Sequence, residues 1–368
     1  MRRIVTILPK GEGFSPQHFG AVALCVRDFT SFSRYQETIT VIGGTATPGF
    51  DGIQYASPPP ARWYQNRTRA YASGAARIIH ERNAELVEIH NRPVLLKLLH
   101  RRVTCRLALH LHNDPQDMDG TATPSERMRV LEMCDGIYCV SAYIRDRFLD
   151  GLPDAAERKT FIIHNGIELP QALPPKEKLI AYAGRMTEGK GALLLAKALH
   201  LALPQLPGWR AILIGSRRHE AGRPLTAHEQ EIADLITPLA PQAELTGFLS
   251  HPQTLDAFAR AAIAVVPSVW EEPFGRTALE AMAYGCAVVS SGRGGLSEVT
   301  ADAALTPDSL TSQTIAEALL KLAQNENECH RLQTAARQRA AHFAIAACAA
   351  KLDDARDVIL NQSNRHAA

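Results

Sequence analysis

Two cations in the second half of the chain, Arg185 and Lys190, have the types and spacing to hold a diphosphate. They flank a turn containing Gly184 and Gly191, which follows an apolar run and precedes a helix-forming stretch. Arginine binds phosphate oxygens through paired hydrogen bonds and lysine acts as a point charge, so together they can neutralise a diphosphate. A solvated basic turn is the alternative interpretation.

Two carboxylates, Glu272 and Glu280, are separated by seven residues in the segment 265–285. Pro273 fixes the entry into a helix, and Gly275 lets the backbone approach a ligand. Glu280 then lies about one and a half turns into that helix, among apolar side chains. A buried carboxylate needs hydrogen-bond partners, and the hydroxyl groups of a sugar or ribose are suitable ones.

A glycine-containing loop, residues 10–20, follows the apolar run 4–8 and leads into a helix that begins near Ala21. The free N–H groups and positive dipole end of such a helix can bind a phosphate. The loop does not have the GxGxxG pattern, so glycines that merely permit a tight turn remain an equal alternative.

Two histidines alternate along the run 107–112, so both point to one face of the expected strand. His112 stands at the carboxyl end, where ligands bind in open α/β sheets. A histidine satisfied within the core is the alternative for His112, and it is the favoured interpretation for His110.

The loop Asp117-Met118-Asp119 formally matches the DxD pattern of metal-dependent glycosyltransferases. Arg185 and Lys190 already supply the positive charge that a metal would provide, so we interpret the two acids as a solvated loop and expect no metal.

A basic stretch, 62–106, contains ten Arg and Lys residues against three Glu. Its leucines and cations could meet anionic lipid headgroups or a lipid-diphosphate acceptor, with Trp63, Arg67 and Arg69 on the acceptor side. A helix that packs its leucines inward and keeps its basic groups in water is the alternative.

Short β-rich runs alternate with helix-length amphipathic stretches throughout the chain, which predicts parallel α/β sheets. The 368 residues are enough for two domains. Prolines in 169–176 mark a linker, because they forbid helix there. We expect two doubly wound units, and predict strands at 4–8, 38–42, 85–90, 106–112, 136–140, 161–164, 179–183, 210–214, 243–246, 263–266 and 287–290, with helices that include 21–32 and 67–81.

Composition restricts the class of protein. A net charge of +2 gives no reason to expect a nucleic-acid partner. The seven cysteines are scattered, without a CxxC pair or zinc spacing, which favours a reducing cytoplasm. The apolar run 4–8 is too short for a signal peptide, and no stretch approaches the roughly 18 apolar residues of a membrane span.

The Glu272 and Glu280 pair, within Glu-Pro-Phe-Gly and Glu-Ala-Met-Ala, resembles the E-x7-E signature of glycosyltransferase family 4. Gly184-Arg185 with Lys190-Gly191 looks like the donor diphosphate motif of that family. The segment 163–168 looks like its hinge-entry segment, and Gly294-Gly295 with Glu298 like its following loop. The resemblance extends over nearly the whole chain.

The resemblance implies the GT-B fold: α/β, with two Rossmann-like doubly wound domains facing a central cleft. Residues 1–169 would form the acceptor-binding domain, with a C-terminal helix at about 346–368 packed back on it. Residues 170–345 would bind the nucleotide-sugar.

The resemblance also implies residue roles. Glu272 would contact hydroxyls of the donor sugar, Glu280 the nucleotide ribose, and His112 the transferred sugar. Phe19-Gly20 stands where the family usually has two adjacent glycines, so the loop departs from the family's pattern there. The implied catalytic residues are His112, Arg185, Lys190 and Glu272, and the implied donor-binding residues are Gly20, Gly184, Arg185, Lys190, Glu272, Phe274, Gly275 and Glu280.

The function implied is that of a retaining, metal-independent hexosyltransferase without a cofactor. It would move a hexose-type sugar from a nucleotide diphosphate-sugar, such as a UDP- or GDP-sugar, to a carbohydrate or lipid-linked oligosaccharide acceptor. Envelope polysaccharide, lipopolysaccharide or exopolysaccharide synthesis is the expected setting, in the cytoplasm and with a peripheral contact to the inner membrane left open.

Two other functions remain open. A nucleotide-sugar epimerase can use the same two-domain architecture and would release free epimerised sugar nucleotide without an acceptor. A non-catalytic coat component that binds glycan would release no nucleotide diphosphate from any donor.

Overall fold

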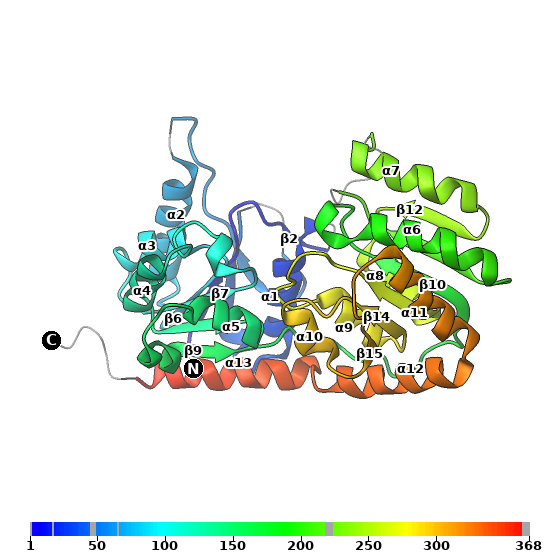
Figure 1. Cartoon of the computed structure of the whole chain (residues 1–368). Helices are drawn as coiled ribbons and strands as arrows, with labels where there is room; N and C mark the ends of the chain where they lie inside the picture. Colours follow the sequence, from blue (N-terminus) through cyan, green and yellow to red (C-terminus); the bar gives the residue numbers. More distant parts are fainter. Residues whose placement is uncertain (1, 17, 45–48, 65, 218–223, 363–368) are drawn as a thin grey trace. The chain divides into compact units, whose positions relative to one another are not determined.

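The computed structural model describes residues 2–16, 18–44, 49–64, 66–217 and 224–362. The chain divides into two compact units (Figure 1). Unit 1 holds residues 1–166 together with the segment that starts at Ile345, and unit 2 holds 167–344. The first segment of unit 1 thus ends three residues before the expected boundary at 169. Unit 2 ends one residue before the expected boundary at 345. Gln17 of the glycine loop and residues 363–368 of the expected C-terminal helix lie outside the described residues.

Unit 1 contains a seven-stranded parallel sheet in the order β5-β4-β1-β6-β7-β8-β9 and a short antiparallel pair, β2 and β3. The inner strands are nearly continuous apolar runs, as expected for a sheet covered on both faces. Its strands are β1 Ile4–Ile7, β2 Phe14–Ser15, β3 His18–Phe19, β4 Ile39–Ile42, β5 Gln54–Ala56, β6 Leu86–His90, β7 Arg106–Leu111, β8 Gly136–Cys139 and β9 Thr160–Ile162.

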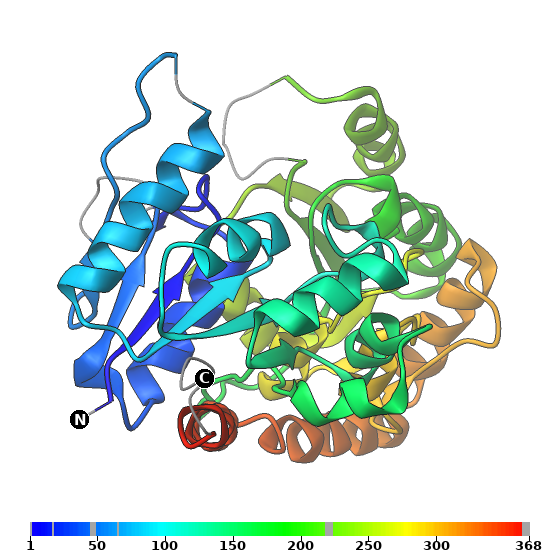
Figure 2. The ribbon, with the colours of Figure 1, turned by 90° about the vertical axis from the view of Figure 1, so that its left-hand side faces the viewer.

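The helices of unit 1 lie on both faces of this sheet. The crossovers from β1 to β4 and from β5 to β6 run in opposite directions, so the right-handed rule places α1 and α2 on opposite faces. Helix α2 lies beside the first strands in Figure 2. The hydroxyl of its Tyr71 donates a hydrogen bond to Leu8 O at 3.0 Å. The helices are α1 Ala21–Phe32, α2 Arg67–Glu81, α3 Pro93–His100, α4 Pro124–Met133, α5 Ala142–Leu149 and α13 Ile345–Leu360, with 3-10 turns at Gln36–Thr38, Pro115–Asp117 and Asp154–Lys159.

Helix α13 packs against α1 and is tied to the sheet by a buried ion-pair network. Arg356 donates to both carboxylate oxygens of Glu88 on β6, at 2.8 and 2.7 Å, and to Asp353 at 2.8 Å. The side chains of Arg356 and Glu88 are each 2% exposed. Glu88 also accepts from Thr6 of β1 at 3.1 Å. The end of the described chain is therefore held to two central strands of unit 1.

Unit 2 contains a six-stranded parallel sheet in the order β12-β11-β10-β13-β14-β15. Helix α6 packs on α11 and α7, and their leucines and alanines form one core with the inner strands. The strands are β10 Glu177–Ala183, β11 Arg210–Ile214, β12 Ala243–Gly247, β13 Ala261–Val266, β14 Ala287–Ser290 and β15 Ala304–Leu305. The helices are α6 Ala192–Ala202, α7 Ala227–Ile236, α8 His251–Arg260, α9 Arg276–Ala283, α10 Gly295–Thr300, α11 Ser312–Gln324 and α12 Glu326–Ala341, with 3-10 turns at Glu188–Lys190, Leu203–Gln205 and Thr237–Leu239.

Among the described residues, no helix combines the length and the apolar character needed to cross a bilayer.

Replacing Arg356 with Met should lower the free energy of unfolding by about 3–5 kcal/mol, because Glu88 would stay buried without its cation. Urea denaturation measures the loss. Adding Glu88→Gln to this variant should restore part of the stability. The matched control is Arg77→Met, since Arg77 pairs with Glu81 while exposed and should cost less than about 1 kcal/mol. Equal losses in the two single variants would contradict the role of the buried pair.

Candidate functional site

The segment that follows β13 forms a loop and then helix α9, and it carries both glutamates of the motif. Gly275 caps the helix in the left-handed region, with φ of +100°. That φ disfavours any residue with a side chain, and a Cβ here would also lie 2.6 Å from Leu296 Cδ1, so glycine is preferred at this position. The loop also pairs with the next one, because Gly295 N donates to Glu272 O at 2.7 Å.

The structure brings Lys190 and Glu272 together. Lys190 Nζ lies 2.7 Å from Glu272 Oε1, which also accepts from the Ser268 hydroxyl at 2.5 Å. Glu272 is 6% exposed. Lys190 sits 4.8 Å from the ring centroid of Trp270, close enough for a cation–π contact. A cation and an anion that are 82 residues apart in sequence thus meet at the carboxyl ends of β10 and β13.

Glu280 has different partners. Its Oε1 atom accepts from His251 Nε2 at 2.9 Å and from Arg276 Nε at 3.0 Å. Burial raises the pKa of this carboxyl, but the hydrogen bond from His251 and the charge of Arg276 outweigh burial, so the pKa lies below its ordinary value. Glu280 is therefore a buried, ionised carboxylate.

His251 is a site residue that sequence reasoning missed. It begins α8, directly after the loop 247–250. A lone histidine next to that loop was the available signal, but only the fold brings it to Glu280, 29 residues further on.

Arg185 follows β10 directly, and its side chain is exposed. No side chain in the described part of the chain forms an ion pair or hydrogen bond with its guanidinium group. Gly184 packs against Gly215 so closely that a Cβ on Gly215 would meet Gly184 O at 1.9 Å. The backbone segments that follow β10 and β11 are therefore in close contact next to Arg185.

For the glycine loop of unit 1, the sequence left a phosphate loop and a simple tight turn as equal alternatives. Glu12 Oε1 accepts from Ala23 N at 3.1 Å in the first turn of α1. A Cβ on Gly20 would lie 2.3 Å from the same oxygen. A carboxylate of the chain itself therefore occupies part of this helix N-terminus, and part of the loop forms the hairpin β2–β3.

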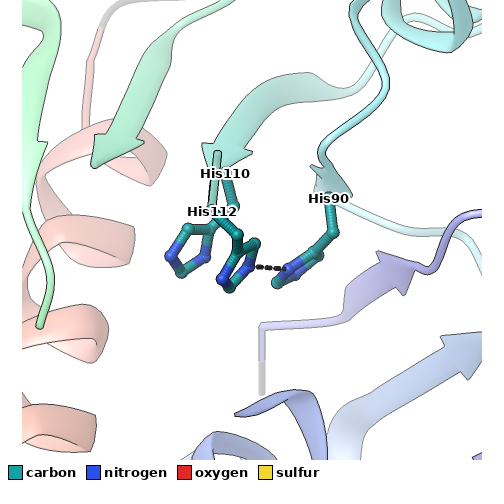
Figure 3. A group of neighbouring side chains, drawn as sticks. All are labelled: His90, His110 and His112. Atoms are coloured by element: carbon teal, nitrogen blue, oxygen red, sulfur yellow. Dashed lines mark hydrogen bonds between the residues drawn. The ribbon is translucent and has the colours of Figure 1, made fainter. Parts of the chain in front are cut away.

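Three histidines gather at the ends of β6 and β7 (Figure 3). His110 is 1% exposed, as expected for a core histidine, and its ring stacks on that of His112 with 4.3 Å between centroids. His112 Nε2 lies 2.8 Å from His90 Nδ1. The backbone N–H of His112 donates to Asn91 Oδ1 at 2.7 Å.

These histidines are the one group of three potential metal ligands in the described part of the chain, with nitrogens within 4.8 Å of one another. A zinc ion lies at about 2.0–2.1 Å from each histidine nitrogen. The planes of the three rings lie at 17° to 32° to one another, and His90 Nδ1 and His112 Nε2 are instead directed at each other, 2.8 Å apart. The geometry is that of a hydrogen-bonded stack.

The predicted acceptor-side residues lie together near the start of α2. Trp63 is 95% exposed and packs edge-on against Tyr64, while Arg67 and Arg69 are exposed in the first turn of the helix. Nearby in unit 1, a pocket of about 530 Å³ is lined by charged and amide groups at the ends of β1, β6 and β7. Its lining includes Lys10, Asn91, Arg92, Asn113, Asp117 and Asp119.

Comparisons with known proteins agree with this architecture. The family model "Glycosyl transferases group 1" matches residues 168–339, and the model "Glycosyltransferase Family 4" matches residues 37–171. The fold and the matched residues define a glycosyltransferase of the GT-B class, as the resemblance implied. Within that class, the chain belongs to glycosyltransferase family 4.

Individual relatives are more distant. YtcC of Bacillus subtilis (strain 168) is 25% identical over 76% of this chain and 72% of its own length. The lipopolysaccharide 1,2-N-acetylglucosaminetransferase of Salmonella typhimurium is 26% identical over 59% of this chain and 57% of its own length. The structure of Anabaena Alr3699/HepE in complex with UDP and glucose has a TM-score of 0.75 at 16% identity, covering 97% of this chain and all of that one. This last likeness shows the fold.

Because the pKa of Glu280 is lowered, its contribution to the free energy of unfolding should depend on pH. A carboxyl whose pKa is lower in the folded than in the unfolded chain stabilises the fold above the unfolded pKa and loses this effect as the pH falls through the folded pKa. The difference in free energy of unfolding between the wild type and Glu280→Gln should therefore be largest near neutral pH and shrink below about pH 4.3. Urea denaturation at a series of pH values measures it, and a difference that grows on acidification would contradict the assignment.

Proposed function

We propose that this protein transfers a hexose-type sugar from a nucleotide diphosphate-sugar to a carbohydrate or lipid-linked oligosaccharide acceptor, with retention of the anomeric configuration. The observation that carries the proposal is the joining of Lys190 to buried Glu272 at the ends of β10 and β13. One basic and one acidic side chain there offer a phosphate partner and a hydroxyl partner side by side.

The diphosphate would be held by Arg185 and Lys190. Arg185 is exposed and has no described side-chain partner, so an anion can bind it without breaking an ion pair. Both residues lie on the turn after β10, where α/β sheets bind ligands. Backbone N–H groups around Phe274 and Gly275 would contribute further hydrogen bonds.

The two glutamates would divide the rest of the donor between them. Glu272 would bind hydroxyls of the sugar and Glu280 those of the ribose. Anabaena Alr3699/HepE, which has a similar fold, was solved in complex with UDP and glucose, and this supports a nucleotide-sugar as the donor. His112 would contact the transferred sugar.

For the reaction we infer a front-face displacement. The bond between the anomeric carbon and the diphosphate oxygen breaks, the acceptor oxygen bonds to the same face, and the acceptor proton passes to the departing phosphate oxygen. Arg185 and Lys190 stabilise the charge that develops on the diphosphate, which is the role a divalent metal would otherwise fill. The proposal is therefore metal-independent and needs no cofactor.

The proposed setting is envelope polysaccharide, lipopolysaccharide or exopolysaccharide synthesis, which the name of the Salmonella relative supports. The seven cysteines are free thiols, which favours a cytoplasmic location. Exposed Trp63 with Arg67 and Arg69 is suited to a glycolipid acceptor at a membrane surface.

Replacing Arg185 with Ala should reduce kcat on the order of 10²–10³-fold, since a preorganised charge on the leaving group is lost. The free energy of unfolding should barely change, because the side chain is exposed. Release of nucleotide diphosphate measures the first and urea denaturation the second. Arg331→Ala, which removes an exposed cation on α12 of the same unit, is the matched control and should keep full activity. Unchanged turnover in Arg185→Ala would defeat the assignment.

A panel of UDP, GDP, ADP and their sugars should identify the donor by thermal shift. A nucleotide present at a hundredfold excess over its Kd stabilises the folded protein by about 2.7 kcal/mol. The shift should disappear in the double variant Arg185→Ala with Lys190→Ala and persist in Arg331→Ala. No shift with any nucleotide would contradict nucleotide-sugar binding.

The same preparations separate the two other functions. An epimerase would convert the donor to a free epimer without an acceptor, which chromatography of the sugar nucleotides detects. A coat component that only binds glycan would bind no nucleotide. Arg185, Lys190, Glu272 and Glu280 disfavour the coat component, because glycan binding alone needs no diphosphate clamp.

A further inference from the structure

The stacked histidines of unit 1 follow directly from strand register. His90 of β6 is paired with His110 of β7, and the side chain of His112, the first residue after β7, returns to the same face two residues later. Phe29 of α1 lies 6.3 Å from the His110 ring, so this is the face that α1 covers. A column of three imidazoles is thereby buried at the edge where parallel strands end (Figure 3).

His90 and Asn91, the last residue of β6 and the one after it, both hold His112. His90 Nδ1 lies 2.8 Å from His112 Nε2, and Asn91 Oδ1 accepts from His112 N at 2.7 Å. One contact orients the ring and the other the main chain. His90 and Asn91 are 3% and 4% exposed, so solvent does not compete for either contact.

Asn91 adopts a backbone conformation that L residues rarely choose. Its φ of +52° places it in the left-handed region, where Asn is tolerated better than most residues. Such strain persists where the surrounding structure enforces it. Here it accompanies the hydrogen bond that the side-chain amide oxygen of Asn91 accepts from His112 N. The neighbouring hydrogen bond from Asn91 N to His110 O, at 2.9 Å, fixes the same turn.

The ring contact also couples the tautomers of two histidines. Burial, with the nearby charge of Arg356, lowers the pKa of His90 to about 3, so His90 is a neutral imidazole near pH 7. A hydrogen bond between His112 and a neutral imidazole needs one N–H facing one lone pair. The position of the proton on His90 therefore dictates which nitrogen of His112 can donate or accept.

We propose that His90 and Asn91 are positioning residues that fix the ring orientation and the tautomer of His112. The inference rests on the proposed function in one respect, namely that His112 contacts the transferred sugar. Neither residue touches the sugar in this scheme. They determine which His112 nitrogen is presented to it, as partners beyond the reacting groups do for histidines in other sites.

The first test needs no substrate. Histidine-selective ¹⁵N labelling and long-range ¹H–¹⁵N spectra report the tautomer of each imidazole in the folded protein. We expect one dominant tautomer of His112 in the wild type and a mixture in His90→Phe, which keeps a stacking ring but has no nitrogen. His90→Asn places an amide near the lost Nδ1 and should restore the single tautomer. An unchanged His112 spectrum in His90→Phe would overturn the proposal.

The second test uses turnover. His90→Phe should reduce kcat by about 10–100-fold while the KM for the donor changes less than about twofold, and His90→Asn should recover most of the loss. Asn91→Gly retains access to the left-handed conformation but removes the amide, so it isolates the second contact. His330→Phe replaces an exposed histidine of unit 2 and should match the wild type.

The outcomes distinguish the coupling of the His90 and His112 tautomers from the role of His112 in sugar transfer. An altered tautomer without any change in kcat would uphold the coupling and reject the role of His112 in transfer. Equal losses in His90→Phe and His90→Asn would reject the coupling. If His90→Phe fails to fold, His90→Asn and Asn91→Gly still give the spectra. Displacement of all three histidine signals by zinc chloride would show a cation site and overturn the proposal.

Discussion

The constraint on which both candidate sites depend is the parallel direction of the strands within each sheet. Parallel pairing brings every carboxyl end to one edge, and the loops that leave this edge are the places where polar side chains can gather without breaking a ladder. Asn91 and His112 follow β6 and β7 in unit 1, while Arg185 follows β10 in unit 2. Residues far apart in sequence thus become neighbours through register alone.

The ion pair of Lys190 and Glu272 gives the proposed donor site its physical character. Taking both charges out of water is costly, and their mutual attraction offsets this cost only with good geometry and further hydrogen bonds, such as that from Ser268. Trp270 covers the ammonium group. A ligand that brings both phosphate and hydroxyl groups can offer an anion to Lys190 and hydrogen-bond donors to Glu272. Binding therefore need not leave either charge buried without a partner.

Local patterns predicted the elements well where the pattern is long. Helices α1 and α2 have the ends expected at 21–32 and 67–81, and strands β11 and β14 also match. Strands β5 and β15 were missed because they are short edge strands without an apolar run. The contact of His251 with Glu280, the entry of Glu12 into the first turn of α1, and the approach of His90 to His112 depend on tertiary packing, which no periodicity in the sequence encodes.

The two glutamates of one motif illustrate how surroundings assign different tasks to the same side chain. Glu272 stands in a loop and faces a lysine that also suits phosphate, so its carboxylate belongs to a cluster of exchangeable charges. Glu280 stands on helix α9 with two nitrogen donors on one oxygen, and its low pKa keeps it ionised. An anion fixed in this way has an acceptor oxygen oriented before any ligand arrives. A carboxylate that is preorganised in this way is suited to bind the two hydroxyl groups of a rigid diol. It is less suited to a role in the chemical step.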